Sequence, residues 1–156
     1  MRGGEISGNT VIDEEIGGAG GVIVWGGTFV MYDGKIFGNT ASLGGGGVEV
    51  GYGGIFTMHD GQIFDNTVTD ARWDWSGGGG VFAQLDGTFV MRGGQIFNNT
   101  TQRSGGGVAI RQGTFTMHDG EIFDNTAENG GGVAIHNSTF TLHDGEIFGN
   151  TAVGND

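Results

Sequence analysis

The segment GEIFDNT, at Gly120–Thr126, is one of six related copies of a single phrase in this chain. The other copies are GEISGNT at 4–10, GKIFGNT at 34–40, GQIFDNT at 61–67, GQIFNNT at 94–100 and GEIFGNT at 145–151. Their asparagines follow one another at intervals of 30, 27, 33, 26 and 25 residues. Self-similarity with a period of about 20–50 residues indicates a solenoid.

Each phrase is the last part of a longer unit. A full unit reads Gly-Gly-Val-x-Ile, a short turn, Thr-Phe-Thr-Met-His-Asp-Gly, and then the phrase. Three short runs rich in Val, Ile, Phe and Thr, separated by Gly, Asn and Asp, predict three strands per unit. We therefore expect an all-β fold, a parallel β-helix with three short strands per coil, about five full coils and a partial N-terminal coil.

The length of 156 residues fits one domain. The phenylalanine of the middle segment precedes the asparagine by 10 residues in every full copy, so length varies only in the loop after Asn-Thr. We expect a single β-solenoid domain over 1–156, with repeats near 1–19 (partial), 20–45, 46–78, 79–105, 106–130 and 131–156.

Strand alternation assigns the side chains of each run to the inside or the outside of the coil. Glu49 lies between two inward valines, so it is expected to point away from the core. The residues expected to point inward are Val22, Val24, Val48, Val50, Val108, Ile110, Val133 and Ile135 in the first run, Phe29, Phe56, Phe89, Phe115, Phe140, Met31, Met58, Met91, Met117 and Leu142 in the second, and Ile6, Ile36, Ile63, Ile96, Ile122 and Ile147 in the third.

The asparagine of the phrase recurs once per coil, which predicts a ladder of side-chain amides along the stack. The alternative role, N-glycosylation, requires Ser or Thr two residues later. Only Asn98, Asn99 and Asn137 meet that requirement. The ladder residues are Asn9, Asn39, Asn66, Asn99, Asn125 and Asn150.

One phenylalanine column follows the inward isoleucine, so alternation sends it outward. The first copy has Ser7 at this position, which suggests that folding does not require an apolar group there. Contiguous exposed apolar patches often mark interfaces, and the competing interpretation is that a loop covers the column. The residues are Phe37, Phe64, Phe97, Phe123 and Phe148.

Two further features have both a binding and a structural interpretation. Trp73 and Trp75, in the insertion VTDARWDWSGG at 68–78, could stack on a sugar or a partner chain, or could cover the Gly-rich strand. His-Asp pairs such as His118-Asp119 could hold a divalent cation, but Asp before Gly also sets a turn. We expect no dedicated metal site and no cofactor.

Composition excludes several functions. A net charge of −12 argues against nucleic acid as a partner, and no run of 18 apolar residues could insert into a membrane. The start, MRGGEISGNT, lacks the apolar segment of a signal peptide. The chain has only six basic residues and no non-repetitive pair of acids that would serve as general acid and base, so we do not expect an enzyme.

The Gly-Gly-Val-x-Ile and Ile-Phe-x-Asn-Thr motifs resemble repeat arrays of bacterial surface proteins. They are most similar to the polymorphic outer-membrane proteins, and Ile122-x-x-Asn125 occupies the place of the Phe-x-x-Asn motif. The resemblance implies a right-handed β-helix of the pectate-lyase-like type, displayed outside the cell in an adhesin passenger.

The residues at the two ends complete the functional hypothesis. Residues 1–10 align without a gap to 91–100, so the chain begins halfway round a coil, and neither end offers a polar cap. We expect a structural subunit that stacks head to tail with copies of itself, with lateral contacts as a further mode, in an extracellular or cell-surface filament, where the next subunit completes the half coil. For the ends, the alternative is that the chain is a fragment of a longer array. For the function, the alternatives are an adhesin-like fragment that binds a glycan or a surface partner, and a polysaccharide lyase or hydrolase. A weak divalent-cation or glycan contact is a further expectation.

Overall fold

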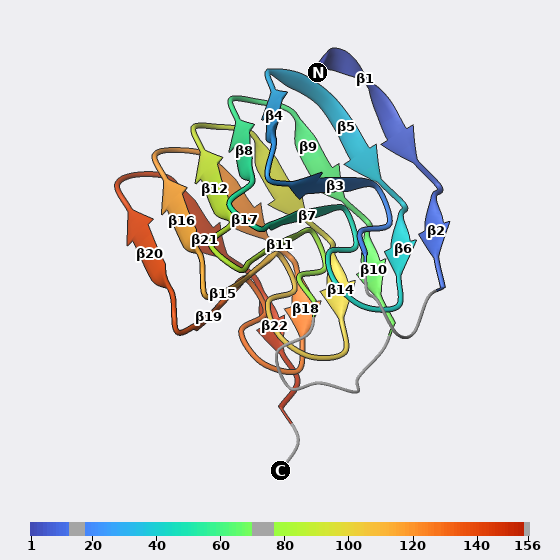
Figure 1. Cartoon of the computed structure of the whole chain (residues 1–156). Helices are drawn as coiled ribbons and strands as arrows, with labels where there is room; N and C mark the ends of the chain where they lie inside the picture. Colours follow the sequence, from blue (N-terminus) through green and yellow to red (C-terminus); the bar gives the residue numbers. More distant parts are fainter. Residues whose placement is uncertain (13–17, 70–76, 155–156) are drawn as a thin grey trace.

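A computed structural model describes residues 1–12, 18–69 and 77–154. These residues form 22 strands and no helix, and all strand pairing is parallel. The strands belong to four sheets that run along the stack, and each full coil contributes one strand to every sheet (Figure 1). The fold is therefore an all-β solenoid of about five turns.

We number the sheets in the order in which a full coil passes through them. Sheet 1 consists of β3 (Val22–Trp25), β7 (Val48–Gly51), β11 (Val81–Gln84), β15 (Val108–Arg111) and β19 (Val133–His136). Sheet 2 consists of β4 (Thr28–Met31), β8 (Ile55–Met58), β12 (Thr88–Met91), β16 (Thr114–Met117) and β20 (Thr139–Leu142). Sheet 3 consists of β1 (Arg2–Ser7), β5 (Asp33–Phe37), β9 (Gln62–Phe64), β13 (Gln95–Phe97), β17 (Glu121–Phe123) and β21 (Glu146–Phe148). Sheet 4 consists of β2 (Thr10–Val11), β6 (Thr40–Ala41), β10 (Thr67–Val68), β14 (Thr100–Thr101), β18 (Thr126–Ala127) and β22 (Thr151–Ala152).

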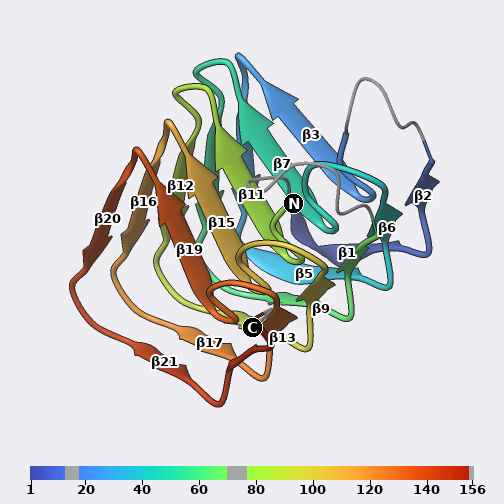
Figure 2. The same ribbon diagram turned by 90° about the horizontal axis from the view of Figure 1, so that it is seen from below.

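The expected count of three strands per coil is wrong, because each full coil has four. The fourth strand is the two-residue segment that starts at the threonine of Asn-Thr. It is short enough to escape a pattern search, yet Ala41, Val68 and Ala127, at its second position, are fully buried. Figure 2 shows how this strand forms a separate side of the coil, next to the loops that lead back to sheet 1.

The strands pair in register, so that equivalent residues of the repeats lie side by side. Phe89 pairs with Phe56 and Phe115, and Ile96 pairs with Ile63 and Ile122. The inward phenylalanines are stacked with ring centroids 4.7–5.2 Å apart. The core is thus a set of columns in which one residue type repeats along the axis, and Phe56, Phe89, Met58, Ile63 and their equivalents in the inner coils are fully buried.

The variable position of the phrase, just before the asparagine, is restricted by the backbone. It is occupied by Gly8, Gly38, Asp65, Asn98, Asp124 and Gly149, and φ at these residues lies between 53° and 67°. Left-handed backbone is open to glycine and is tolerated best by Asn and Asp among the other residues. The turn between sheets 3 and 4 therefore explains why only these three residue types occur there.

A close approach of coils explains the paired glycines before sheet 1. A Cβ atom on Gly107 would lie 2.7 Å from the carbonyl oxygen of Gly132 and 3.0 Å from Nδ2 of Asn125. Gly80 has the equivalent surroundings, with Gly107 and Asn99 as its neighbours. The glycines thus allow the backbones of successive coils to pass the asparagine ladder closely.

We predict that Gly107→Ala lowers the free energy of unfolding by about 1–3 kcal/mol, the usual cost of overpacking a tight site. Gly27→Ala is the matched control, because a Cβ there would meet only the carbonyl oxygen of Trp25 at 3.9 Å. Urea unfolding of both variants measures the difference. Equal stability of the two variants would contradict the close packing described above.

Candidate functional surfaces

The asparagine ladder is the most extensive side-chain network among the described residues. Oδ1 of Asn99 accepts hydrogen bonds from the backbone N–H of Asn66 at 3.0 Å and from Nδ2 of Asn66 at 2.9 Å. Nδ2 of Asn99 in turn donates to Oδ1 of Asn125 at 3.0 Å and to the carbonyl of Ile63 at 3.0 Å. The same arrangement joins Asn9, Asn39, Asn66, Asn99, Asn125 and Asn150 into one continuous chain.

This network is buried in the middle of the stack, where Asn39, Asn66, Asn99 and Asn125 are fully buried. A buried amide is stabilised only if its polar atoms are paired, and here each one is paired with the coils on both sides. The ladder therefore holds the corner between sheets 3 and 4, and its side chains are not available to bind a ligand.

The outward phenylalanine column lies on sheet 3 and is only partly exposed. Phe37, Phe64, Phe97 and Phe123 are half-buried, and Phe148 in the last coil is 46% exposed. Successive rings are stacked nearly parallel, with centroids 4.9–5.3 Å apart. Each ring thus covers its neighbours and leaves one strip of apolar surface along the stack.

A polar ladder lies beside this column on the same face of sheet 3. Nε2 of Gln62 donates to Oε1 of Gln95 at 2.9 Å, and Nε2 of Gln95 donates to Oε2 of Glu121 at 2.8 Å. The face therefore presents an apolar strip flanked by amide and carboxylate groups, which is a surface that a partner could contact.

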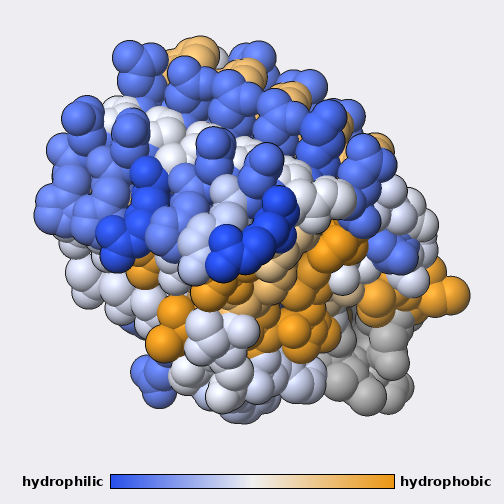
Figure 3. Space-filling model, turned by 90° about the horizontal axis from the view of Figure 1, so that it is seen from above, coloured by the Kyte–Doolittle hydropathy of each residue, from blue (hydrophilic) through white to orange (hydrophobic). Residues whose placement is uncertain are grey.

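The corner between sheets 2 and 3 carries the His-Asp pairs and is mostly hydrophilic (Figure 3). His118 and His143 stack at 4.8 Å, Tyr32 and His59 stack at 4.7 Å, and the guanidinium of Arg2 lies 4.4 Å from the Tyr32 ring centre. The aspartates here set the turns, since Oδ1 of Asp33, Asp60, Asp119 and Asp144 accepts the N–H of the following glycine at 2.6–2.9 Å. Within the described ranges, no three His, Asp or Glu side chains are placed to hold a metal ion.

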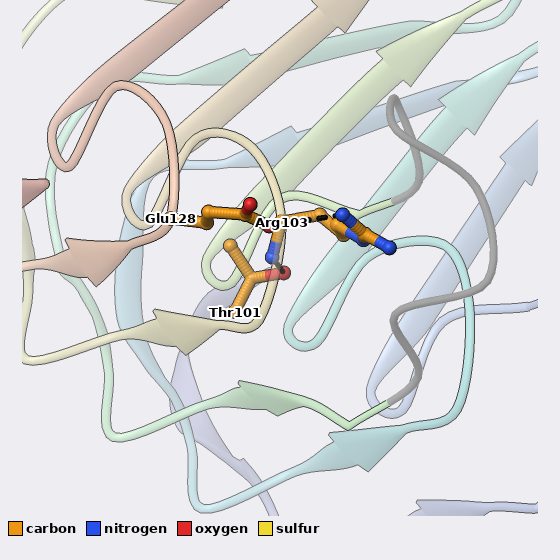
Figure 4. Close-up of polar contacts among 3 residues, drawn as sticks. All are labelled: Thr101, Arg103 and Glu128. Carbon is orange, nitrogen blue, oxygen red and sulfur yellow. Dashed lines mark hydrogen bonds and ion pairs between the residues drawn. The ribbon is translucent and has the colours of Figure 1, made fainter. Parts of the chain in front are cut away.

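The outer face of sheet 1 is covered by the loops that follow sheet 4. Arg103 and Glu128, on the loops of adjacent coils, form an ion pair at 3.0 Å, and the N–H of Arg103 donates to Oγ1 of Thr101 at 3.3 Å (Figure 4). Beneath these loops Phe82 and Ala109 are each only 3% exposed. The alternation of apolar and polar residues did not predict that loops cover this face of sheet 1. The uninterrupted apolar run Val81–Ala83 is nevertheless typical of a strand that is buried on both faces.

A small pocket remains between the loops and this face. Its volume is about 170 Å³, and it is lined by Phe82, Ala109, Ala134, Ser104, Asn129 and His136, among others. Pockets for small molecules are usually about 300–1,000 Å³, so this one is small for a sugar or a drug-sized ligand.

Glu49 points away from the core as expected, but it is buried rather than solvated. It is only 2% exposed, and its Oε1 accepts hydrogen bonds from Nε1 of Trp25 at 3.3 Å and Nε2 of Gln84 at 2.9 Å. Its Oε2 makes no hydrogen bond to the described part of the chain and lies against Gly44. Burial raises the pKa of this carboxyl group above its ordinary value, and the two side-chain hydrogen bonds act in the opposite direction.

The two ends of the stack expose core columns. Ile135, Leu142 and Ile147 in the last coil are 50%, 48% and 37% exposed. Their equivalents one coil earlier, Ile110, Met117 and Ile122, are almost fully buried. At the other end, Met1, Ile6, Val22 and Phe29 are only partly buried against the core. Each end is therefore a cross-section of the core with unpaired strand edges.

Trp73 and Trp75 lie outside the described residues. Among the described residues, no helix is long and apolar enough to cross a membrane. Val81 and Ala83, which alternation had not assigned, supply the inward column of sheet 1 in the third full coil and are fully buried.

We predict that Asn99→Ala lowers the free energy of unfolding by at least about 3 kcal/mol, because it leaves several buried donors and acceptors unpaired at about 1–3 kcal/mol each. Asn9→Ala is the matched control at the exposed end of the ladder, where the side chain only donates to Asn39. Its expected cost is about 1 kcal/mol or less. Chemical denaturation of both variants tests the ladder, and comparable losses would contradict its central role.

A second prediction concerns Glu49. The pKa of Glu49 in the folded chain lies above the unfolded value of about 4.3. At pH values between these two pKa values, the folded chain therefore binds more protons than the unfolded chain. The contribution of Glu49 to stability is then greatest at low pH and falls as the pH rises through this interval. Glu49→Gln should be more stable than the wild type at neutral pH, and the difference should vanish as the pH falls towards 4. Unfolding free energies over a pH series check this, with the exposed Glu146→Gln measured in parallel as a control.

Comparison with known proteins gave no matching family model, no similar curated protein and no similar solved structure.

Proposed function

We propose that this chain is a structural, non-catalytic β-solenoid subunit that stacks end to end into an extracellular or cell-surface filament. The observation that supports this most directly is the state of the last coil. Its side chains repeat the columns of the coils before it, yet Ile147 and Phe148 on sheet 3 are 37% and 46% exposed. Covering them with another coil would remove apolar surface from water at about 25 cal/mol per Å².

The backbone favours the same association. Parallel strands at the end of a stack present unpaired N–H and C=O groups, which are a template for pairing with another chain. Head-to-tail contact between unlike ends does not close, so it propagates into a filament. The two ends of this stack are unlike, because strands β1 and β2 lie at one end and strands β19–β22 lie at the other.

The asparagine ladder supplies specificity to this contact. At one end, Asn9 uses its backbone N–H and Nδ2 to donate, and at the other end Oδ1 of Asn150 accepts from Asn125. In a stack, the N–H and Nδ2 of Asn150 would donate to Oδ1 of Asn9 in the next copy. The ladder would then continue across the junction with the geometry that it has inside the chain.

Two finer points belong to this proposal. The resemblance to bacterial surface repeats is the basis for the location outside the cell and for a right-handed winding of the coil. The half-exposed phenylalanine column supports lateral contacts between filaments as a secondary mode, because it is an apolar column that points away from the core and runs through five of the six strands of sheet 3.

We predict that Ile147→Asp abolishes concentration-dependent end-to-end assembly, because it places a charge on the exposed isoleucine column of sheet 3 in the last coil. Ile55→Asp is the matched control, since Ile55 is 41% exposed on the side of the stack. Sedimentation velocity and electron microscopy of the three proteins measure the outcome. A wild type that remains a short monomer at high concentration sinks the proposal, as does equal assembly of the two variants.

A further inference from the structure

We infer that the outer face of sheet 3 binds a basic amphipathic helix of a partner protein. The helix lies along the axis of the stack, with its apolar side on the phenylalanine column and its lysines or arginines beside the carboxylates that flank this column. The inference goes beyond the proposed function and does not depend on end-to-end stacking. It rests on the spacing of the phenylalanine rings, on an acidic groove next to them and on the charge of the chain.

The phenylalanine column presents ring edges rather than ring faces. Successive rings are nearly parallel, with interplanar angles of 2–7° and centroids 4.9–5.3 Å apart. Each ring between the two ends of the column therefore has both of its faces against its neighbours. A ligand that stacks on aromatic faces finds no free face there, whereas an apolar side chain can pack against the ring edges. The column thus favours a protein partner over a glycan.

The rings recur at nearly the pitch of an α-helix. From Phe37 to Phe148 the column is about 20 Å long. A helix rises about 5.4 Å per turn and about 1.5 Å per residue, so about 14 residues cover the column with one apolar residue for each ring. The mismatch accumulated over four steps is only about 1–2 Å. An extended segment fits less well, because the side chains on one of its faces recur at about 6.7 Å.

An acidic groove runs beside the column on the same face of sheet 3. Its volume is about 490 Å³, and the charged residues that line it include Asp119, Asp144, Glu121 and Glu146. The two glutamates stand two residues before the phenylalanines of β17 and β21, so they are about 6.7 Å from the column along the strand. A lysine or arginine on the flank of a helix that covers the column can reach across this distance.

The carboxylates of the groove are bonded to amides rather than to basic side chains. Asp119 and Asp144 each accept the N–H of the following glycine, and Glu121 accepts Nε2 of Gln95 at 2.8 Å. Among the described residues, no lysine or arginine forms an ion pair with them. Their negative charge therefore remains to attract a cationic partner.

Acidic residues also flank the other side of the column. Asp65 and Asp124 are exposed in the turn between sheets 3 and 4, directly after Phe64 and Phe123. An apolar strip between two acidic margins is complementary to a helix whose apolar side is flanked by basic residues. A second copy of the chain fits less well, because its net charge is −12 and Lys35 is the one basic residue in the column of side chains two positions before the phenylalanines. A bound helix would exclude lateral contacts from the same face.

The test uses a synthetic helical peptide of about 14 residues that has a leucine stripe flanked by lysines. A control peptide has the same composition in a scrambled order, which removes the stripe and keeps the charge. Fluorescence anisotropy measures the binding of each peptide to the full chain at concentrations where the chain is monomeric. We expect the striped peptide to bind at least about tenfold more tightly than the scrambled one, and added salt to weaken its binding.

Variants of the chain locate the site. Phe97→Ser should weaken binding at least about fivefold, and the fold accommodates serine at the equivalent Ser7. Ile55→Thr, which removes an exposed apolar group from sheet 2, is the matched control without an effect. Lys35→Glu should tighten binding about twofold to fivefold, because it removes a repulsive charge. Arg111→Glu makes the same charge change on sheet 1 and should leave the affinity unchanged. A gain of affinity cannot arise from a loss of folding.

Equal binding of the two peptides overturns the inference, as does an affinity for the striped peptide that neither Phe97→Ser nor Lys35→Glu changes. Side-by-side association of the chain that excludes the striped peptide also overturns it, and leaves this face as a contact between copies. None of these outcomes bears on end-to-end stacking, so the proposed function is tested separately by Ile147→Asp.

Discussion

Parallel pairing in register is the constraint on which the rest of this structure depends. Each coil is joined to the next through four sheets, so a residue at one position meets its own equivalent above and below. A side chain is therefore selected for contact with copies of itself. Phenylalanine rings stack, aliphatic groups form continuous columns, and asparagine amides donate and accept along one line. Few other residue types satisfy themselves in this way without a different partner.

The asparagine column shows how in-register pairing makes a buried polar group favourable. An amide buried in an apolar corner is unfavourable unless its donors and acceptor are paired. Inside the stack, the neighbouring coils provide these pairs, and they would be absent in an isolated coil. The ladder therefore makes each coil depend on its neighbours, which is the behaviour expected of solenoids, where stability resides in the contacts between repeats.

The sequence was sufficient to predict the solenoid, its parallel strands and the inward columns, because each column repeats one residue type at a constant offset from the asparagine. It was not sufficient to predict the fourth strand, since two residues carry no detectable alternation. It also misjudged the surroundings of Glu49. Alternation gives the direction of a side chain relative to its own sheet, but it does not reveal a loop from elsewhere in the coil that folds over that face. Phe82 lies under the same cover. The half-buried state of the phenylalanine column has a similar origin, because each ring is shielded by the rings of adjacent coils rather than by its own strand.

The direction of the amide ladder has a consequence for kinetics. Every amide-to-amide hydrogen bond of the ladder runs from Nδ2 of one coil to Oδ1 of the coil that follows it in the sequence, so a filament built from this chain would be polar from end to end. One tip offers the backbone N–H of Asn150, and the other offers Oδ1 of Asn9 beside the partial coil of β1 and β2. Because these tips differ in chemistry and in shape, subunits would join and leave them at different rates, and the filament would have a fast-growing and a slow-growing end.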